Sequence, residues 1–250
     1  MAESEWKYFA ERPYLSGIFL WTGIDYRGEP TPLAYPAVYS QFGILDYCAF
    51  PKDNFYYYKS WWTDEPVLHI FKGENADGTI SVYCYTNLPE TELFINGKSY
   101  GRKQVEKNWY LVWENVAYET GEITAKGYKD GKELIDTIEP PKTPKSIVIE
   151  PYNKAVSKGD AVIINIKITD ENGDLVTNAD NELCFTVEGG KLLGTGNGNP
   201  ADHASEKLPV RRAFNGLCQL IVKASGNDDL RITVSSDTIN NGEKTECIVK

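Results

Sequence analysis

The sequence predicts a mainly β protein with two immunoglobulin-like β-sandwich domains, preceded by a shorter segment of a different kind. Aromatic residues locate the first boundary, because residues 1–62 hold 18 of the 31 Phe, Trp and Tyr residues in this chain of 250. After residue 62, short apolar runs separated by Gly, Asn and Asp are typical of antiparallel strands and turns. Three prolines within residues 139–144 disfavour helix and central strand and indicate a tether. The predicted domains are therefore residues 1–62, 63–142 and 143–250.

The first of these segments predicts one buried strand between two helices. Residues 15–21 (LSGIFLW) form a nearly continuous apolar run, which is typical of a strand covered on both faces in a parallel sheet. Residues 5–11 are compatible with the end of a helix, and Asp53 is a candidate N-cap for a helix over residues 54–62. A single strand cannot complete a parallel sheet, because both its edges would stay exposed. The segment therefore looks like part of a larger barrel or doubly wound sheet.

The second segment predicts about seven strands, as an antiparallel sandwich requires. The dipeptides Asn96-Gly97 and Asp130-Gly131 favour two-residue hairpins, because both central positions of such turns need a positive φ. Strands are expected in the apolar or alternating runs at residues 67–71, 80–85, 92–95, 121–128 and 133–138.

The third segment predicts a second sandwich from the same kinds of signal. Residues 170–173 (DENG) indicate a turn, and no helix-period pattern of useful length occurs after residue 62. Strands are expected at residues 146–150, 161–169, 182–187, 216–224, 230–235 and 245–249.

Composition excludes several classes of protein. The longest apolar runs are a few residues long, whereas a membrane helix needs about 18 or more, so no membrane partner is expected. The formal charge of −10, with no Lys- or Arg-dense stripe, argues against binding to nucleic acid or to an anionic membrane surface. The amino-terminal residues are acidic where a secretory signal has basic residues, so we expect no export signal in this chain.

Cysteines and histidines give no sign of a metal site. Five Cys at wide spacing, with no C-x-x-C pair and two His, fit neither a zinc site nor a disulfide framework. We expect buried or half-buried free thiols, no metal and no cofactor. Residues 194–200 are Gly-rich but lack the Gly-Lys-Ser/Thr ending of a phosphate-binding loop, so that function is excluded too.

Candidate binding residues follow the predicted buried strand, where loops of α/β barrels carry active sites. Trp21 could stack on the apolar face of a sugar, while Asp25 and Glu29 could accept hydrogen bonds from its hydroxyls. In the alternative interpretation, Trp21 belongs to a core, and the two carboxylates fix the loop through backbone bonds and a pair with Arg27. They are poor candidates for the two carboxylates of a glycosidase, because a single loop would have to set their separation.

A second aromatic cluster occupies residues 55–62. Its rings could form a sugar-stacking platform, because aromatic rings offer flat faces with polar edges. On a helix, however, Phe55, Tyr58 and Trp62 share one side, and we expect that side to pack against a barrel.

Longer motifs are similar to those of a known family. Residues 17–32 (GIFLWTGIDYRGEPTP), 39–46 (YSQFGILD) and 50–53 (FPKD) closely resemble the β-galactosidase-like members of glycoside hydrolase family 2. The resemblance covers essentially the whole chain, and it continues through residues 92–99, 101–103, 170–174, 196–198 and 212–216, which look like two sandwich domains after the barrel.

The resemblance implies that the first segment is the end of a truncated (β/α)8 barrel. In this family the acid/base Glu follows the fourth barrel strand and the nucleophile Glu follows the seventh, while residues 15–21 match the eighth. Both catalytic carboxylates would then lie before Met1, so no residue of the chain is expected to be catalytic. Trp21 matches a tryptophan that lines the sugar subsite, Asp25 and Glu29 match the same loop, and Phe42 matches loosely an aromatic near the pocket.

Three functions follow as hypotheses. The first is the carboxyl-terminal portion of a retaining β-galactosidase-type exo-glycosidase, inactive alone, whose partners are a β-linked glycan or oligosaccharide and the missing barrel portion or a homo-oligomer. The second is a non-catalytic carbohydrate- or protein-binding module built from two immunoglobulin-like domains. The third is a structural role in bracing a barrel or an oligomer interface. In each case the aromatic residues 1–62 predict a loosely packed amino-terminal third unless they dock on the second segment.

Overall fold

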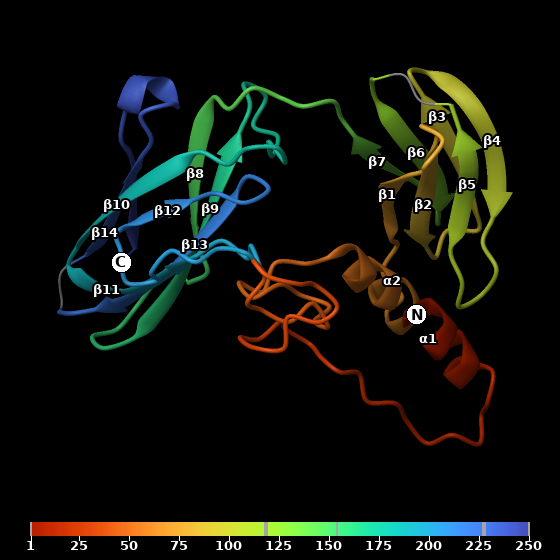
Figure 1. Ribbon diagram of the computed structural model, residues 1–250, viewed down its shortest axis with the longest axis horizontal. Coiled ribbons are helices and arrows are strands. Elements are labelled where there is room, and N and C mark those ends of the chain that lie inside the picture. Colours follow the sequence, from red (N-terminus) through yellow and green to blue (C-terminus); the bar gives the residue numbers. More distant parts are fainter. Residues whose placement is uncertain (1, 118–119, 154, 227–228, 250) are drawn as a thin grey trace. The chain divides into compact units, whose positions relative to one another are not determined.

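The computed structural model describes residues 2–117, 120–153, 155–226 and 229–249 and confirms a mainly β fold (Figure 1). The chain forms two compact units. The first contains Met1–Gly23 and Pro51–Pro140, and the second contains Ile24–Phe50 and Pro141–Lys250. The residues preceding the first sandwich are therefore shared between the two units, while the series of three domains expected from the sequence stays a prediction.

The first unit contains the seven strands expected for the first sandwich. A three-stranded sheet has the order β1-β2-β5 and a four-stranded sheet the order β4-β3-β6-β7, all antiparallel. Side chains such as Val82, Leu93 and Ile123 fill the core between them. The strands are β1 (Leu68–Glu74), β2 (Ile80–Thr86), β3 (Glu90–Ile95), β4 (Lys98–Gln104), β5 (Leu111–Val116), β6 (Ile123–Lys129) and β7 (Lys132–Ile138).

Two helices of the first unit cover part of this sandwich. They are α1 (Ala2–Ala10) and α2 (Asp53–Trp62), which confirms both expected helices. The ring of the buried Tyr57 of α2 packs at an angle of 60° against that of Tyr85 of β2, with ring centroids 5.4 Å apart, and the Tyr57 hydroxyl donates to the carbonyl oxygen of Asn108 (2.9 Å). The indole of Trp61 donates to the carbonyl oxygen of Trp109 (3.1 Å). The helices therefore dock on the sandwich through paired polar groups as well as rings.

Two details of α2 differ from expectation. Lys52 is the N-cap, without a side-chain capping bond, and Asp53 is the first helical residue, where its charge complements the helix dipole. The buried side chains are Tyr57, Tyr58 and Ser60, while Trp62 is exposed, and packing of the side that holds Phe55, Tyr58 and Trp62 against a barrel stays a prediction. The face packs on the sandwich in this chain, because that sandwich supplies the nearest apolar surface.

Residues 15–21 do not form the predicted strand. They have no regular secondary structure, and the side chain of Phe19 is fully exposed. The physical reason is that a parallel strand is held by hydrogen bonds to neighbouring strands, and no strand in the described part of the chain pairs with these residues. The run has the apolar pattern of a buried strand, but strands that could pair with it are not found among the described residues.

The second unit is built on the second sandwich. Its sheets have the orders β11-β13-β9-β8 and β12-β10-β14-β15, and Ile164, Leu220 and Ile232 lie in the core between them. The strands are β8 (Ser146–Pro151), β9 (Ala161–Thr169), β10 (Glu182–Glu188), β11 (Gly190–Gly196), β12 (Val210–Arg212), β13 (Leu217–Ala224), β14 (Leu230–Ser235) and β15 (Thr245–Val249). All six expected strands are confirmed, and β11 and β12 are additional.

Outside the strands, the described residues of the second unit form one short helix, η1 (Asn240–Gly242), and the irregular segment Ile24–Phe50, which packs on the sandwich.

All five cysteines are free thiols; Cys48, Cys84 and Cys218 are buried, whereas Cys184 is exposed. None of the described helices is long and apolar enough to span a membrane.

Candidate functional site

The segment Ile24–Phe50 holds its shape through Asp25. This buried carboxylate accepts a hydrogen bond from the backbone N–H of Gly43 (2.7 Å), and the backbone N–H of Asp25 donates to the carbonyl oxygen of Leu45 (3.1 Å). A Cβ at position 43 would collide with both of these backbone groups, so only glycine allows the two strands of the loop to approach this closely. The geometry around Asp25 is that of a loop-fixing residue, and a role in binding substrate stays a prediction.

Glu29 lies at an exposed turn of the same segment. Gly28 and Glu29 both have positive φ, at 91° and 43°, and the N–H of Gly28 donates to the carbonyl oxygen of Val38 (2.9 Å). The Tyr26 hydroxyl donates to one carboxylate oxygen of Glu29 (2.5 Å). The turn thus presents a carboxylate and a phenol side by side to solvent, a pair that can accept hydrogen bonds from vicinal hydroxyls.

Arg27 pairs with a carboxylate that lies far along the chain. Its guanidinium contacts Glu206 of the second sandwich (2.6 Å) and the Tyr39 hydroxyl (2.9 Å), and that hydroxyl donates to Glu206 (3.1 Å). Burial, reinforced by the Glu206 carboxylate, raises the pKa of Tyr39, so the phenol stays protonated and able to donate. Glu206 was missed by sequence reasoning, because 179 residues separate it from Arg27 and no local pattern links them.

Other contacts between this segment and the sandwich lie in the loop formed by residues 197–209. The backbone N–H of Val38 donates to the carbonyl oxygen of Pro200 (2.8 Å), and Nε2 of His203 donates to that of Pro36 (2.6 Å). At Gly198 a Cβ would collide with the carboxylate of Asp46. The second sandwich therefore fixes the position of the segment that carries Asp25 and Glu29.

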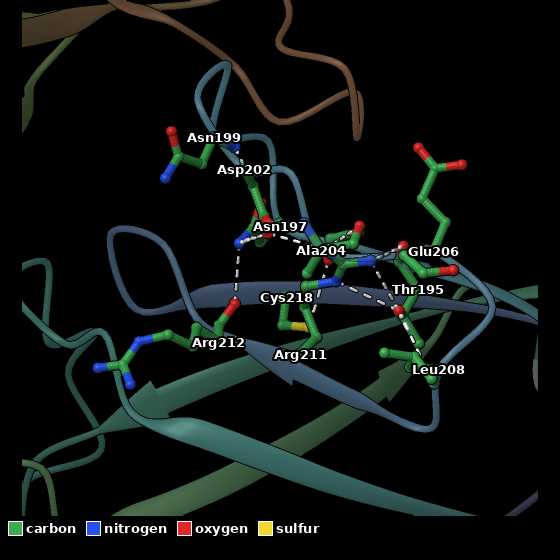
Figure 2. A network of polar contacts seen from close by, with 12 residues as sticks. Thr195, Asn197, Asn199, Asp202, Ala204, Glu206, Leu208, Arg211, Arg212 and Cys218 are labelled. Atoms are coloured by element: carbon green, nitrogen blue, oxygen red, sulfur yellow. Dashed lines mark hydrogen bonds and ion pairs between the residues drawn. The ribbon is translucent and has the colours of Figure 1, made fainter. Parts of the chain in front are cut away.

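The loop of residues 197–209 is itself held by Arg211, at the centre of the network in Figure 2. The Arg211 side chain is 3% exposed and pairs with Asp202 at 2.8 Å. It also donates to the carbonyl oxygens of Ala204 and Thr195, each at 3.2 Å. Asn197 adds hydrogen bonds to Asp202 (2.8 Å) and to the carbonyl oxygen of Arg212 (2.9 Å).

Trp21 belongs to the first unit, whereas Asp25 and Glu29 belong to the second, so the three predicted residues do not share one compact unit. The Trp21 side chain is 75% exposed. The alternative in which it belongs to a core is therefore not realised in this chain, and its ring offers a face to solvent. Phe42, which matched only loosely, is partly exposed.

The two histidines have structural surroundings. His69 lies between Asp53 (2.9 Å) and Asp136 (3.5 Å) and stacks on Tyr56, with ring centroids 3.9 Å apart. His203 donates to a backbone carbonyl, as described above. Among the described residues, no group of three or more His, Cys, Asp or Glu is placed to hold a metal ion.

Comparisons with known proteins match both sandwiches. Residues 147–245 match the family model described as glycoside hydrolase family 2 C-terminal domain 5, and residues 77–135 match a domain of unknown function (DUF4982). The chain is 36% identical to a β-galactosidase from Bacteroides ovatus over 244 residues, which cover 94% of this chain and 29% of that protein. It is 31% identical to a putative β-glucuronidase from Formosa agariphila, covering 89% of this chain and 23% of that protein.

A solved structure agrees with these relatives. The crystal structure of a β-glycosidase from Bacteroides vulgatus matches with a TM-score of 0.85 and 34% identity, covering 100% of this chain and 32% of that one. The chain thus spans less than a third of the length of the curated relatives named above.

Proposed function

We propose, from the premise that this chain belongs to glycoside hydrolase family 2 and represents its carboxyl-terminal part, that it serves a β-galactosidase-type retaining exo-glycosidase. The observation that carries the proposal is the 36% identity to a β-galactosidase, which extends over nearly the whole chain. In this role the chain supplies a sugar-subsite loop and two structural sandwiches. The catalytic pair of glutamates lies outside it, and the chain alone is inactive.

The first unit supports this proposal through an apolar groove. Tyr8 and Phe9 of α1, together with Leu15 and Ile18, line a groove of about 510 Å³. Tyr14 and Phe19 in the same stretch are exposed. Exposed apolar side chains concentrated in one segment mark a surface that another part of a protein covers. The proposed occupant is the rest of the barrel, which would also supply strands to pair with residues 15–21.

Within that enzyme, Trp21 stacks on the sugar ring, and Glu29 accepts hydrogen bonds from its hydroxyls. The exposed indole face of Trp21 and the solvent-facing carboxylate of Glu29 suit these roles. Asp25 contributes indirectly, because its bond to Gly43 fixes the loop.

A chimera tests the proposal. The chain would replace the corresponding carboxyl-terminal part of the Bacteroides ovatus β-galactosidase, and hydrolysis of an aryl β-galactoside would be measured. We expect turnover by the chimera and none by the chain alone. Trp21→Ala should lower kcat/KM at least about tenfold, the equivalent of about 1.4 kcal/mol. Tyr152→Ala, at an exposed aromatic residue after β8, is the matched control and should change nothing.

Two results would contradict the proposal. Turnover by the isolated chain would mean that catalytic groups lie within it. A folded but inactive chimera would contradict the proposed role of the chain in the enzyme. Equal effects of the Trp21 and Tyr152 substitutions would contradict the proposed contact of Trp21 with the sugar.

The second candidate is a non-catalytic carbohydrate- or protein-binding module. It is favoured by the two separate hydrophobic cores, which are large enough for each sandwich to fold without a barrel. Saturable binding of glycans or a protein by the isolated chain, together with an inactive chimera, would support this candidate over the enzyme.

A further inference from the structure

The loop of residues 197–209 has a second side that the proposed subsite does not use. In the view of Figure 2, the side chains of Asn199 and Arg212 lie on the side of the network opposite Glu206, which contacts Arg27. On this second side is a groove of about 590 Å³, formed entirely by residues 180–214 of the second sandwich. Small-molecule sites in proteins have volumes of about 300–1,000 Å³, so the groove has room for a ligand.

The wall of the groove is built to keep its shape. The buried Arg211 and the partly buried Asp202 form an ion pair that supports it. Because desolvation opposes the attraction between buried charges, such a pair adds little net stability compared with apolar side chains. It does hold the loop in one geometry, through the contacts of Arg211 with Thr195 and Ala204. Binding sites need this kind of rigid support behind the residues that touch a ligand.

The polar lining combines donors with acceptors. Arg212 and Asp180 form an exposed ion pair at 2.9 Å. The side-chain oxygen of Asn199 accepts from the N–H of Ala201 (2.9 Å), which leaves its two amide hydrogens without a partner in the described part of the chain. Glu182 adds an exposed carboxylate from β10. A sugar hydroxyl both donates and accepts, so neighbouring guanidinium, amide and carboxylate groups suit pairs of vicinal hydroxyls.

Apolar side chains complete the lining. Leu208, Val210 and Phe214 contribute to the same groove, and Leu208 is half-exposed. Apolar surface beside fixed polar groups is the usual composition of a small-molecule site, and it suits the C–H face of a pyranose ring.

The charge of the groove selects among saccharides. Asp202 is neutralised by Arg211, and Asp180 by Arg212, which leaves the carboxylate of Glu182 as the remaining charge of the lining described here. A slightly negative site repels uronates, sulfated sugars and nucleic acids. The favoured ligand is therefore a neutral saccharide.

We propose that this groove of the second sandwich binds a neutral oligosaccharide, at a site separate from Trp21, Asp25 and Glu29. The proposal rests on the proposed function only for the class of ligand, a glycan. A glycosidase that holds a distant part of its substrate in this way keeps the glycan near the enzyme between cleavages. The bound part raises the effective concentration of the rest of the glycan at the active site.

Titration calorimetry on the 250-residue chain tests the proposal. The probes are β-1,4-linked galactotetraose, xylotetraose and cellotetraose, with tetragalacturonic acid as an acidic probe of the same length. We expect saturable binding of at least one neutral tetrasaccharide and none of the acidic one. Arg212→Ala and Asn199→Ala should each weaken binding at least about tenfold, or about 1.4 kcal/mol. Arg231→Ala, which removes an exposed Arg paired with Glu246 on the same sandwich, is the matched control and should have no effect. Trp21→Ala should have none either.

The outcomes separate this site from the proposed subsite. Binding that Trp21→Ala abolishes and the groove variants leave intact would overturn the groove and support the subsite. Absence of binding by any neutral probe, or equal binding of tetragalacturonic acid, would also overturn the groove, while the chimera experiment would still decide the proposed function. Circular dichroism shows whether each variant folds; if Arg212→Ala does not, Asn199→Ala and Glu182→Gln carry the test.

Discussion

At the scale of single residues, Arg211 illustrates how one buried charge organises a site. Its guanidinium reaches Thr195, Asp202 and Ala204, which belong to β11 and to the loop that follows it. That loop in turn holds His203 and Glu206 against the segment Ile24–Phe50. Arg211 therefore acts mainly on geometry: it fixes the loop of residues 197–209, and that loop contacts the segment Ile24–Phe50.

Replacing Arg211 with Met should destabilise the second unit by about 1–3 kcal/mol, because the partly buried Asp202 would lose its cation and the loop would lose the hydrogen bonds of the guanidinium. Arg212→Met is the matched control. It removes an exposed pair with Asp180 and should change stability by about 0–1 kcal/mol. Urea unfolding followed by circular dichroism measures both, and equal losses in the two variants would contradict the assigned role.

Asp202 also predicts a dependence of stability on pH. Burial acts to raise its pKa, but hydrogen bonds from the N–H of Ala204 and from Arg211, together with the charge of Arg211, outweigh burial and lower the pKa below its usual value. A carboxylate with a lowered pKa in the folded state stabilises the fold above its unfolded pKa of about 3.9, and this contribution is lost as the pH falls.

The urea midpoint of the second unit should therefore fall as the pH is lowered from 5 to 3. Asp202→Asn should reduce stability at pH 6 and make this decline shallower, whereas Asp237→Asn, at an exposed carboxylate of the same sandwich, should leave the decline unchanged. Parallel declines in the wild type and Asp202→Asn would show that another group is responsible.

In the candidate site, interactions between residues close in the sequence could be predicted, whereas those between distant residues could not. The sequence suggested that Asp25 could fix its loop, and the bond to Gly43 lies only 18 residues away. The contact of Arg27 with Glu206 was not predicted, because Glu206 comes near it only when the sandwich has folded. The roles of Trp21, Asp25 and Glu29 toward a sugar stay predictions, since they depend on a ligand.

At the scale of elements, the hairpin turns were predictable because their backbone requirement is local. Asn96 and Gly97 have φ of 50° and 77°, and Asp130 and Gly131 have φ of 52° and 77°, as two-residue hairpins require. Strands β11 and β12 gave no comparable signal. Glycines at 190, 194 and 196 interrupt the apolar pattern of β11, and β12 is three residues long. The run at residues 15–21 had the pattern of a strand but lacks partners, which a sequence window cannot reveal.

The β3–β4 hairpin gives a test at this scale. Gly97→Val should destabilise the first sandwich by about 1–2 kcal/mol or more, because a β-branched residue is strained at a φ of 77°. Gly73→Ala is the matched control, since its φ is not positive and its Cβ would make an ordinary contact with Tyr83; it should stay within about 0.5 kcal/mol. Thermal unfolding measures both, and a neutral Gly97→Val would show that the turn tolerates another geometry.

At the scale of the whole molecule, the chain passes between its two units three times, after Gly23, Phe50 and Pro140. Each unit has its own hydrophobic core, with Val82 and Leu93 in the first and Ile164 and Leu220 in the second. The stretch that resembles the end of a barrel is divided between the two units, with Trp21 in the first unit and Asp25 and Glu29 in the second.

Separate cores predict separate unfolding, and the distribution of tryptophan makes this measurable. All six Trp residues lie in the first unit, so their fluorescence reports that unit, whereas far-ultraviolet circular dichroism reports both. Arg211→Met should lower the stability seen by circular dichroism and leave the midpoint of the Trp fluorescence transition unchanged, while Gly97→Val should lower the fluorescence midpoint. If Arg211→Met shifts both transitions equally, the two units unfold as one cooperative body.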